Sequence, residues 1–154
     1  MTVRPMAAAD LEAVMLLAAA IPEAPHWESS VYRAFLESET DPQRRIFVSE
    51  DSGEVAGFIA GQITFDICEL ESIAVALTHR RAGVGSALLA ALTAWAGESN
   101  VLKIQLEVRS ANRSAISFYE RHGFCPDGLR RGYYRQPEDD ALLMSLILRS
   151  GSNR

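Results

Sequence analysis

The fold is decided by residues 73–95, IAVALTHRRAGVGSALLAALTAW, where the end of a strand leads through a glycine-rich turn into a helix. The helix is predicted over Gly83–Trp95, because its apolar residues recur at helical spacing. The glycines at 83 and 85 let the backbone approach a ligand closely. At the start of such a helix, unbonded N–H groups and the helix dipole favour an anion. With the basic pair Arg80-Arg81 beside it, the turn predicts a pyrophosphate site.

The glycine pattern differs from two common phosphate-binding motifs. It is not a P-loop, because no Gly-Lys-Ser/Thr sequence follows. It is not a full dinucleotide fingerprint, because Leu88 stands where the third glycine belongs. From the residues alone, a plain glycine-rich helix start without a ligand is the alternative interpretation.

Patterning on either side of this unit predicts further strands and helices. Strands are predicted at Thr2–Arg4, Ile46–Val48, Val55–Thr64, Ile67–Val75, Val101–Val108, from Phe124 onward, and at Ala141–Leu148. Helices are predicted after a capping Asp10, from Ser29 or Ser30 to Leu36, and over Arg113–His122 between a capping Asn112 and a terminating Gly123. Turns are predicted at Ser52–Glu54 and at the acidic residues Glu138–Asp140. This order of elements predicts a mixed α/β (α+β) fold around one sheet.

Composition fits one globular domain that handles neither nucleic acid nor membrane. The chain has 154 residues, of which 48% are hydrophobic and 23% charged, and we predict one domain over residues 1–149 with a flexible tail at 150–154. The formal net charge of -5 disfavours a broad nucleic-acid surface but suits a basic peptide. The apolar stretch Leu11–Ile21 is too short to span a membrane.

Cysteine and histidine usage predicts a cytoplasmic protein without a metal. Cys68 and Cys125 are far apart and form no CxxC pair, so we expect two reduced, buried thiols. The N-terminus lacks the basic start and following apolar run that are typical of a secretory signal. The histidines His26, His79 and His122 are scattered, and we expect no metal ligand among them.

A second segment carries a candidate acid–base pair. Glu107 lies near the end of a predicted strand, on the face opposite the apolar residues, and Tyr119 lies on the following helix. A carboxylate and a phenol brought together can act as base and acid when an amine attacks a thioester. The alternatives stay open at this point: Glu107 pairs with Arg109, and Tyr119 only packs.

These segments resemble a known superfamily. The run Ile73-Ala74-Val75 followed by Arg80-Arg81-Ala82-Gly83-Val84-Gly85 resembles the acetyl-CoA signature of the GNAT N-acetyltransferases, Arg/Gln-x-x-Gly-x-Gly/Ala. The stretch Leu106–Phe124, with Leu-Glu-Val-Arg, Asn112 and Phe118-Tyr119-Glu120, is similar to the ribosomal-protein-alanine N-acetyltransferase branch, as are Arg131–Tyr134, Asp140–Met144 and, less closely, Pro25–Trp27. One departure is Ala76-Leu77, where family members often carry an acidic residue and a proline.

The resemblance implies a fold, an activity and a set of site residues. The implied fold is a central mixed, mostly antiparallel sheet flanked by helices, and the implied activity is direct acetyl transfer from acetyl-CoA to an amine. Glu107 would be the general base, directly or through a water, and Tyr119 the general acid. The implied acetyl-CoA contacts are Ile73, Ala74 and Val75 for the pantetheine arm, Arg81, Ala82, Gly83, Val84, Gly85 and Ser86 for the pyrophosphate, and Asn112 for the arm.

The acceptor follows less directly from the sequence. We expect a protein N-terminus or peptide amine, such as that of a ribosomal protein, and a monomer or weak homodimer. A small-molecule amine and a non-catalytic CoA-binding module are the alternatives. Trp27, Tyr133 and Tyr134 are core or acceptor-site wall, and Glu69 and Glu71 meet a positive substrate or lie on a solvated strand face.

Overall fold

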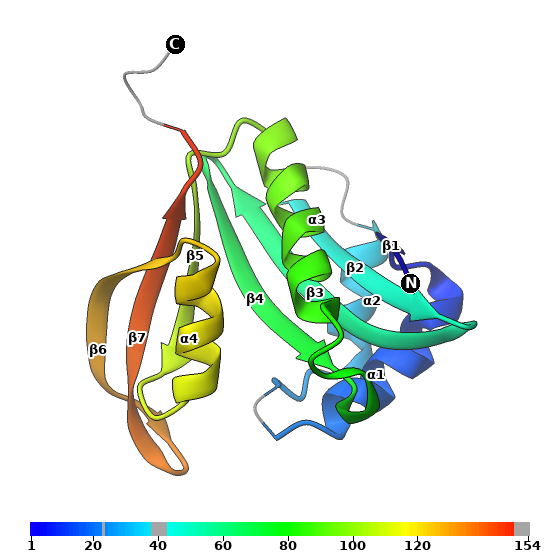
Figure 1. Cartoon of the computed structure of the whole chain (residues 1–154), viewed down its shortest axis with the longest axis horizontal. Helices are drawn as coiled ribbons and strands as arrows, with labels where there is room; N and C mark the ends of the chain where they lie inside the picture. The colour runs from blue at the N-terminus through cyan, green and yellow to red at the C-terminus, as the bar shows by residue number, and fades with distance from the viewer. Residues whose placement is uncertain (23, 38–42, 150–154) are drawn as a thin grey trace.

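A single sheet organises the molecule, in the order β1-β2-β3-β4-β5-β7-β6 (Figure 1). The computed structural model describes residues 1–22, 24–37 and 43–149, so the predicted tail at 150–154 lies outside it. The strands are β1 (Thr2–Pro5), β2 (Gln43–Asp51), β3 (Glu54–Thr64), β4 (Ile67–Val75), β5 (Lys103–Arg109), β6 (Cys125–Arg135) and β7 (Glu138–Ile147). Neighbouring strands pair antiparallel except β4 and β5, which are parallel. The predicted mixed, mostly antiparallel sheet is confirmed.

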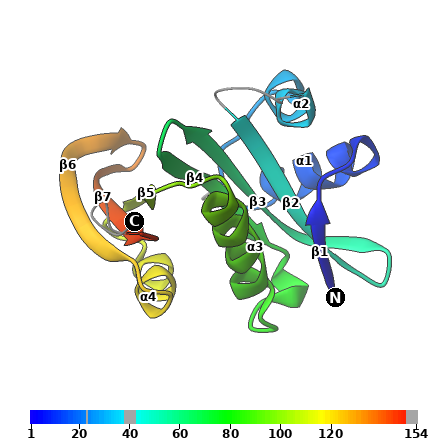
Figure 2. The ribbon, with the colours of Figure 1, turned by 90° about the horizontal axis from the view of Figure 1, so that it is seen from above.

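Helices cover both faces of this sheet. The helices are α1 (Leu11–Ala19), α2 (Ser29–Glu37), α3 (Val84–Glu98) and α4 (Arg113–Arg121), with short 3-10 turns η1 (Ala8–Asp10) and η2 (Leu77–His79). Figure 2 shows α1 and α2 on one face and α3 and α4 on the other. Each pair closes its own cluster of buried apolar side chains against the sheet. Among them, Trp95 is buried.

The parallel pair β4–β5 is short, and this divides the sheet. Only Ile67–Glu69 pair with Lys103–Gln105. Beyond them the two strands separate, as Figure 1 shows, with β4 leading towards the start of α3. In the ladder with β3, Ser72 faces Ala60 and Leu70 faces Gly61, so Glu71 is the extra residue of a bulge. The sheet therefore opens in its middle, between β4 and β5.

Helix α3 packs directly on β3 because two glycines leave room for it. A Cβ on Gly57 would stand 2.8 Å from the backbone oxygen of Ala74, and one on Gly61 would stand 2.6 Å from Leu92 Cδ1. A close helix–sheet contact of this kind requires the missing side chains. The contact holds the start of α3 near the end of β4.

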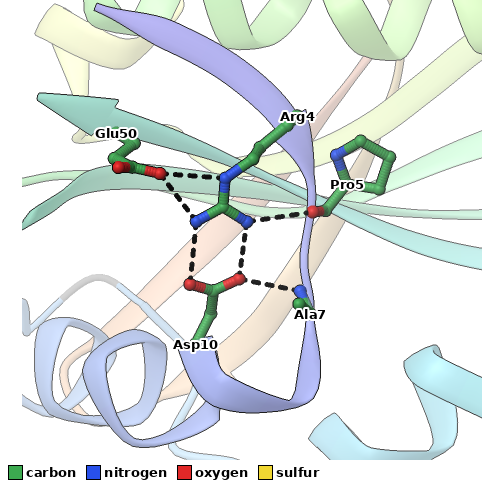
Figure 3. Close-up of polar contacts among 5 residues, drawn as sticks. All are labelled: Arg4, Pro5, Ala7, Asp10 and Glu50. Atoms are coloured by element: carbon green, nitrogen blue, oxygen red, sulfur yellow. Dashed lines mark hydrogen bonds and ion pairs between the residues drawn. The ribbon is translucent and has the colours of Figure 1, made fainter. Parts of the chain in front are cut away.

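A charged cluster fixes the N-terminal strand to the turn before α1 (Figure 3). The guanidinium of Arg4 donates to both carboxylate oxygens of Asp10, at 2.8 and 3.0 Å, and to Glu50 at 3.0 Å. Asp10 also accepts from the N–H of Ala7 at 2.7 Å. The ion pair with Arg4 lowers the pKa of Asp10. The prediction that the Asp10 side chain caps α1 is therefore wrong, because its oxygens bind groups that precede the helix.

The predicted acidic turn between the last two strands is also wrong. Arg135 faces Glu138 in the ladder, so the turn is Gln136-Pro137 and the acidic residues begin β7. The carboxylates serve as acceptors for backbone groups instead: Ala111 N–H donates to Asp139 at 3.1 Å, and Gly132 N–H donates to Asp140 at 2.8 Å. Acceptors engaged in this way do not need to face water in a turn.

The two cysteines differ in their surroundings. Both are free, but Cys68 is fully buried and Cys125 is exposed on the edge strand β6, so the expectation of two buried thiols is wrong for Cys125. Burial raises the pKa of the Cys68 thiol to about 12, with a further contribution from Glu71 and Glu69. Within the described ranges, no helix is long and apolar enough to cross a membrane.

Candidate functional site

Two cavities meet where the sheet opens. One, here called the loop cavity, has a volume of about 450 Å³ and lies between the end of β4 and the starts of α3 and α4. The other, here called the strand cavity, has a volume of about 540 Å³ and lies between β4, β5 and β6. Both are lined by Ile73, Asn112, Ala115 and Tyr119. A ligand in one cavity would therefore adjoin a ligand in the other.

The loop cavity collects nearly all the residues predicted to bind acetyl-CoA. Its lining includes Ile73, Ala74, Val75, Arg81, Gly83, Val84, Gly85, Ser86 and Asn112. Ala82 lies in the same turn but does not line the cavity. On the side of β4 that faces β5, residues Ile73–Val75 have no strand beside them among the described residues, because the pairing of β4 with β5 ends at Glu69. This free edge can bind an extended ligand as an added strand would.

The turn before α3 lines this cavity, and its backbone conformation is unusual. Arg81 and Gly83 adopt positive φ angles of 67° and 81°, a left-handed conformation that Gly83 takes without a steric cost. Between residues 81 and 86, no amide N–H donates to a described backbone carbonyl. Successive free amides at a helix start form a site for an anion. A Cβ on Gly85 would come within 3.3 Å of the Phe118 ring, so the glycine also lets α3 approach α4.

Asn112 is bound on one side and free on the other. Its side-chain oxygen accepts from the N–H of Ala115 at 3.3 Å, which confirms the predicted cap of α4. The side-chain nitrogen forms no hydrogen bond with a described residue. Since Asn112 lines both cavities, its two remaining N–H donors are available to a ligand at their junction.

Tyr119 combines a packed ring with an unused hydroxyl. The ring is 6% exposed and contacts Phe118 and Phe124 at centroid distances of 5.4 and 5.5 Å. Its hydroxyl bonds no described residue, and the side chain lines both cavities. Burial raises the pKa of Tyr119 to about 12, so the phenol stays protonated at neutral pH. The ring packs against its neighbours, as in the alternative that Tyr119 only packs, but the hydroxyl stays available as a proton donor.

Glu107 lines the strand cavity and pairs with Arg130. Its Oε2 lies 2.9 Å from the Nε of Arg130, outside hydrogen-bonding geometry, so that oxygen has an ion-pair partner but no hydrogen bond. The alternative that Glu107 pairs with Arg109 is wrong. Arg109 instead donates to the backbone oxygen of Pro137 at 2.7 Å and lies over the Tyr134 ring at 4.2 Å. No sequence signal pointed to Arg130, because an irregular register in β6 decides where it lies.

The remaining candidates gather around the strand cavity. Trp27, Tyr133 and Tyr134 all line it, so they are walls of this cavity, and Trp27 also packs on Phe35 at 5.7 Å. Glu69 and Glu71 line it as well. Glu69 is exposed, but Glu71 is partly buried, so a solvated face describes only the first of the two.

Two histidines lie at the loop cavity: His79 lines it, and His122 contacts the lining residue Ser86. His122 Nδ1 donates to the backbone oxygen of Phe118 at 2.8 Å, which leaves Nε2 to accept from the Ser86 hydroxyl at 3.0 Å. His79, in η2, lies 3.1 Å from Asp51. Among the described residues no three His, Cys, Asp or Glu side chains gather in a way that suits a metal ion.

Comparisons with known proteins agree on one family. The family model described as Acetyltransferase (GNAT) family matches residues 11–124. A Bacillus subtilis protein, assigned as a ribosomal protein bS18-alanine N-acetyltransferase, is 30% identical over 142 residues, 92% of each chain. The crystal structure of the ribosomal-protein-S18-alanine N-acetyltransferase from Escherichia coli has a TM-score of 0.84 and 29% identity, over 99% of this chain and 97% of that one. A Bacillus anthracis structure with acetyl coenzyme A, assigned as a streptothricin acetyltransferase, has a TM-score of 0.68 and 28% identity, over 75% and 68%.

Proposed function

The chain belongs to the acetyltransferase (GNAT) family, and on that premise we propose that it transfers the acetyl group of acetyl-CoA to the N-terminal amine of a protein. The observation that carries the proposal is the meeting of two cavities at Tyr119, one bordered by free backbone amides and the other by a carboxylate. A thioester and an amine held in these two cavities would adjoin at their common wall.

The loop cavity fits the donor. The free N–H groups of residues 81–86 and the start of α3 would hold the pyrophosphate, and Arg81 adds positive charge beside it. The unpaired edge of β4 over Ile73–Val75 would bind the pantetheine arm, and the free amide of Asn112 would donate to that arm. Bound acetyl-CoA supplies an activated acyl group, and these residues orient its thioester towards the strand cavity.

The acid–base steps fall to two side chains. Glu107 takes a proton from the acceptor ammonium, directly or through a water, and the free amine attacks the thioester carbonyl. A backbone N–H near Val75 meets the carbonyl oxygen as negative charge develops there. Tyr119, a neutral phenol, donates its proton to the sulfur as the C–S bond breaks, and the proton that the nitrogen then loses on becoming an amide restores the phenol, directly or through a water. Holding both reactants in place contributes much of the acceleration.

The strand cavity would take the acceptor, and the comparisons favour a protein N-terminus over a small amine. The structure is more similar to the ribosomal-protein-S18-alanine enzyme of Escherichia coli, with a TM-score of 0.84, than to the streptothricin and nourseothricin enzymes, with TM-scores of 0.68 and 0.75. The cavity walls are aromatic and acidic, with Trp27, Tyr133 and Tyr134 beside Glu69 and Glu71, which suits an ammonium group on a peptide. A cytoplasmic monomer or weak homodimer stays our prediction for the working enzyme.

The test is a screen of acetyl-CoA turnover over acceptors. Peptides that begin with different residues, Ala and Ser included, are compared with the same peptides acetylated at the N-terminus and with small amines such as polyamines. We expect turnover on free N-termini and none on the blocked peptides. Preference for small amines would replace the acceptor assignment, and tight acetyl-CoA binding without any transfer would make the protein a CoA-binding module.

A further inference from the structure

Buried polar atoms without a hydrogen-bond partner concentrate in the strand cavity. Four such side-chain atoms occur among the described residues: Ser49 Oγ, Glu71 Oε1, Ser72 Oγ and Glu107 Oε2. The last three belong to residues that line this one cavity. Buried polar groups are nearly always hydrogen-bonded in folded proteins, and leaving them unpaired costs stability. Their clustering therefore indicates a place for a polar ligand.

Glu71 and Glu107 hold matching positions on the two walls of the opening. The last paired residues of β4 and β5 are Glu69 and Gln105, and each glutamate lies two residues further along its strand. Glu71 is also the extra residue of the β4 bulge, a feature that commonly turns a side chain towards a functional site. The two carboxylates thus flank the region where the strands separate.

The two carboxylates differ in what already binds them. Glu107 has the guanidinium of Arg130 at 2.9 Å. Glu71 forms no hydrogen bond or ion pair with a described residue, and its burial raises its pKa, an effect that the charge of Arg44 opposes and the charge of Glu69 adds to. A partly buried carboxylate of this kind is stabilised when a cation binds beside it. Glu71 is therefore the better placed of the two to hold a cation.

We propose that Glu71 binds the ammonium group of the acceptor and positions it opposite Glu107. The inference rests on the proposed function and adds a residue to it. The ammonium donates one N–H to each carboxylate; Glu107, or its water, then takes one proton, while Glu71 stays a carboxylate throughout. The site thereby selects primary amines in their charged form, and acceptors whose N-terminus carries no charge bind without this contact.

The experiment measures acceptor binding separately from turnover. Peptide binding to protein saturated with CoA is followed by calorimetry for an Ala-first peptide and for the same peptide N-acetylated. For wild type we expect the free amine to bind more tightly than the blocked one. Glu71→Gln should weaken free-amine binding about ten- to hundred-fold, since a charge-assisted contact is lost, and leave the blocked peptide and CoA unaffected. Glu98→Gln, the same change on an exposed glutamate of α3 that lines neither cavity, should alter binding less than about three-fold.

A thermal melt separates binding from a structural role. Removal of an unpaired, partly buried charge should leave the Tm of Glu71→Gln unchanged or raised. A lowered Tm with an unchanged ratio of free to blocked peptide affinity would show that Glu71 serves the fold and overturn the inference. Equal binding of both peptides by wild type would overturn it as well.

Turnover by the same samples distinguishes the inference from the proposed function. Transfer by wild type, with the same acceptor KM in Glu71→Gln, would leave the function standing and remove the role of Glu71. Absence of transfer, with free-amine binding that depends on Glu71, would remove the function and keep the ammonium site.

Discussion

The substitution Tyr119→Phe removes one oxygen from the junction of the two cavities and leaves the packing intact. The ring contacts with Phe118 and Phe124 persist, and the hydroxyl has no hydrogen-bond partner among the described residues. No partner is therefore orphaned, and we expect the free energy of unfolding to change by less than about 1 kcal/mol. The change separates the chemistry of the phenol from its place in the core.

The expected loss is in turnover. A positioned general acid contributes about 10²- to 10⁴-fold to a rate, which corresponds to roughly 2.7–5.5 kcal/mol of activation free energy. Because burial raises the pKa of Tyr119 to about 12, the acid form persists well above the ordinary tyrosine range. Wild-type kcat should therefore show no fall from loss of this proton at pH 9–10, and the effect of the substitution should be constant from pH 7 to 10.

The assay is steady-state release of CoA with a saturating peptide, run beside acetyl-CoA calorimetry and urea unfolding. We expect kcat to fall while the Kd for acetyl-CoA and the unfolding midpoint stay near wild type. Full turnover of Tyr119→Phe across the pH range would refute the acid role. A loss confined to acetyl-CoA affinity would show that the hydroxyl binds the donor and gives up no proton.

Three further predictions concern packing, reactivity and acid stability. Gly57→Ala places a methyl 2.8 Å from a backbone oxygen of β4 and should destabilise the protein by about 1–3 kcal/mol in urea unfolding. Gly97→Ala, in α3 with open space around it, should instead stabilise the protein by about 0.5–1 kcal/mol. Equal effects of the two substitutions would contradict the close α3–β3 contact. Iodoacetamide should label Cys125 in the native protein and Cys68 only after unfolding, as mass spectrometry can check; early labelling of the buried thiol would be inconsistent with its burial. Asp10→Asn should lower the Tm at pH 7, because the folded-state pKa of this carboxyl is lowered and its contribution is present above the unfolded pKa of about 4; the difference should shrink as pH falls through the folded pKa, and a pH-independent difference would rule out the ion pair as its cause.

Local sequence patterns were sufficient for the elements and for the glycine turn that borders the loop cavity. Each predicted strand and helix exists, with ends that shift by a few residues, because alternation and helical spacing report which face of a segment is buried. The glycine turn also acts locally: Gly83 takes its left-handed conformation within the same short stretch that carries the free amides. Asn112 caps α4 through a residue only three positions away.

The predictions from sequence were wrong where a side chain binds a partner that is distant in the sequence. Asp10 has the side chain of a helix cap, but Arg4 and Glu50 come together when β1 pairs with β2, and the carboxylate binds the guanidinium instead. The acidic residues at 138–140 look like a solvated turn, but they begin β7, and the side-chain oxygens of Asp139 and Asp140 accept from backbone groups of the neighbouring segments. Neither partner can be read from the residues adjacent in sequence.

By itself, then, the sequence determined the order of strands and helices, the glycine turn that opens α3, and the candidate pair Glu107 and Tyr119. Only the tertiary structure decided that Arg130, and not Arg109, lies beside Glu107, and that Glu71 stands on the opposite wall. The physical reason is that secondary structure depends on contacts a few residues apart, whereas strand register is set by bulges and pairings between distant segments. A shift of one residue in β4 or β6 would send these side chains to the other face of the sheet.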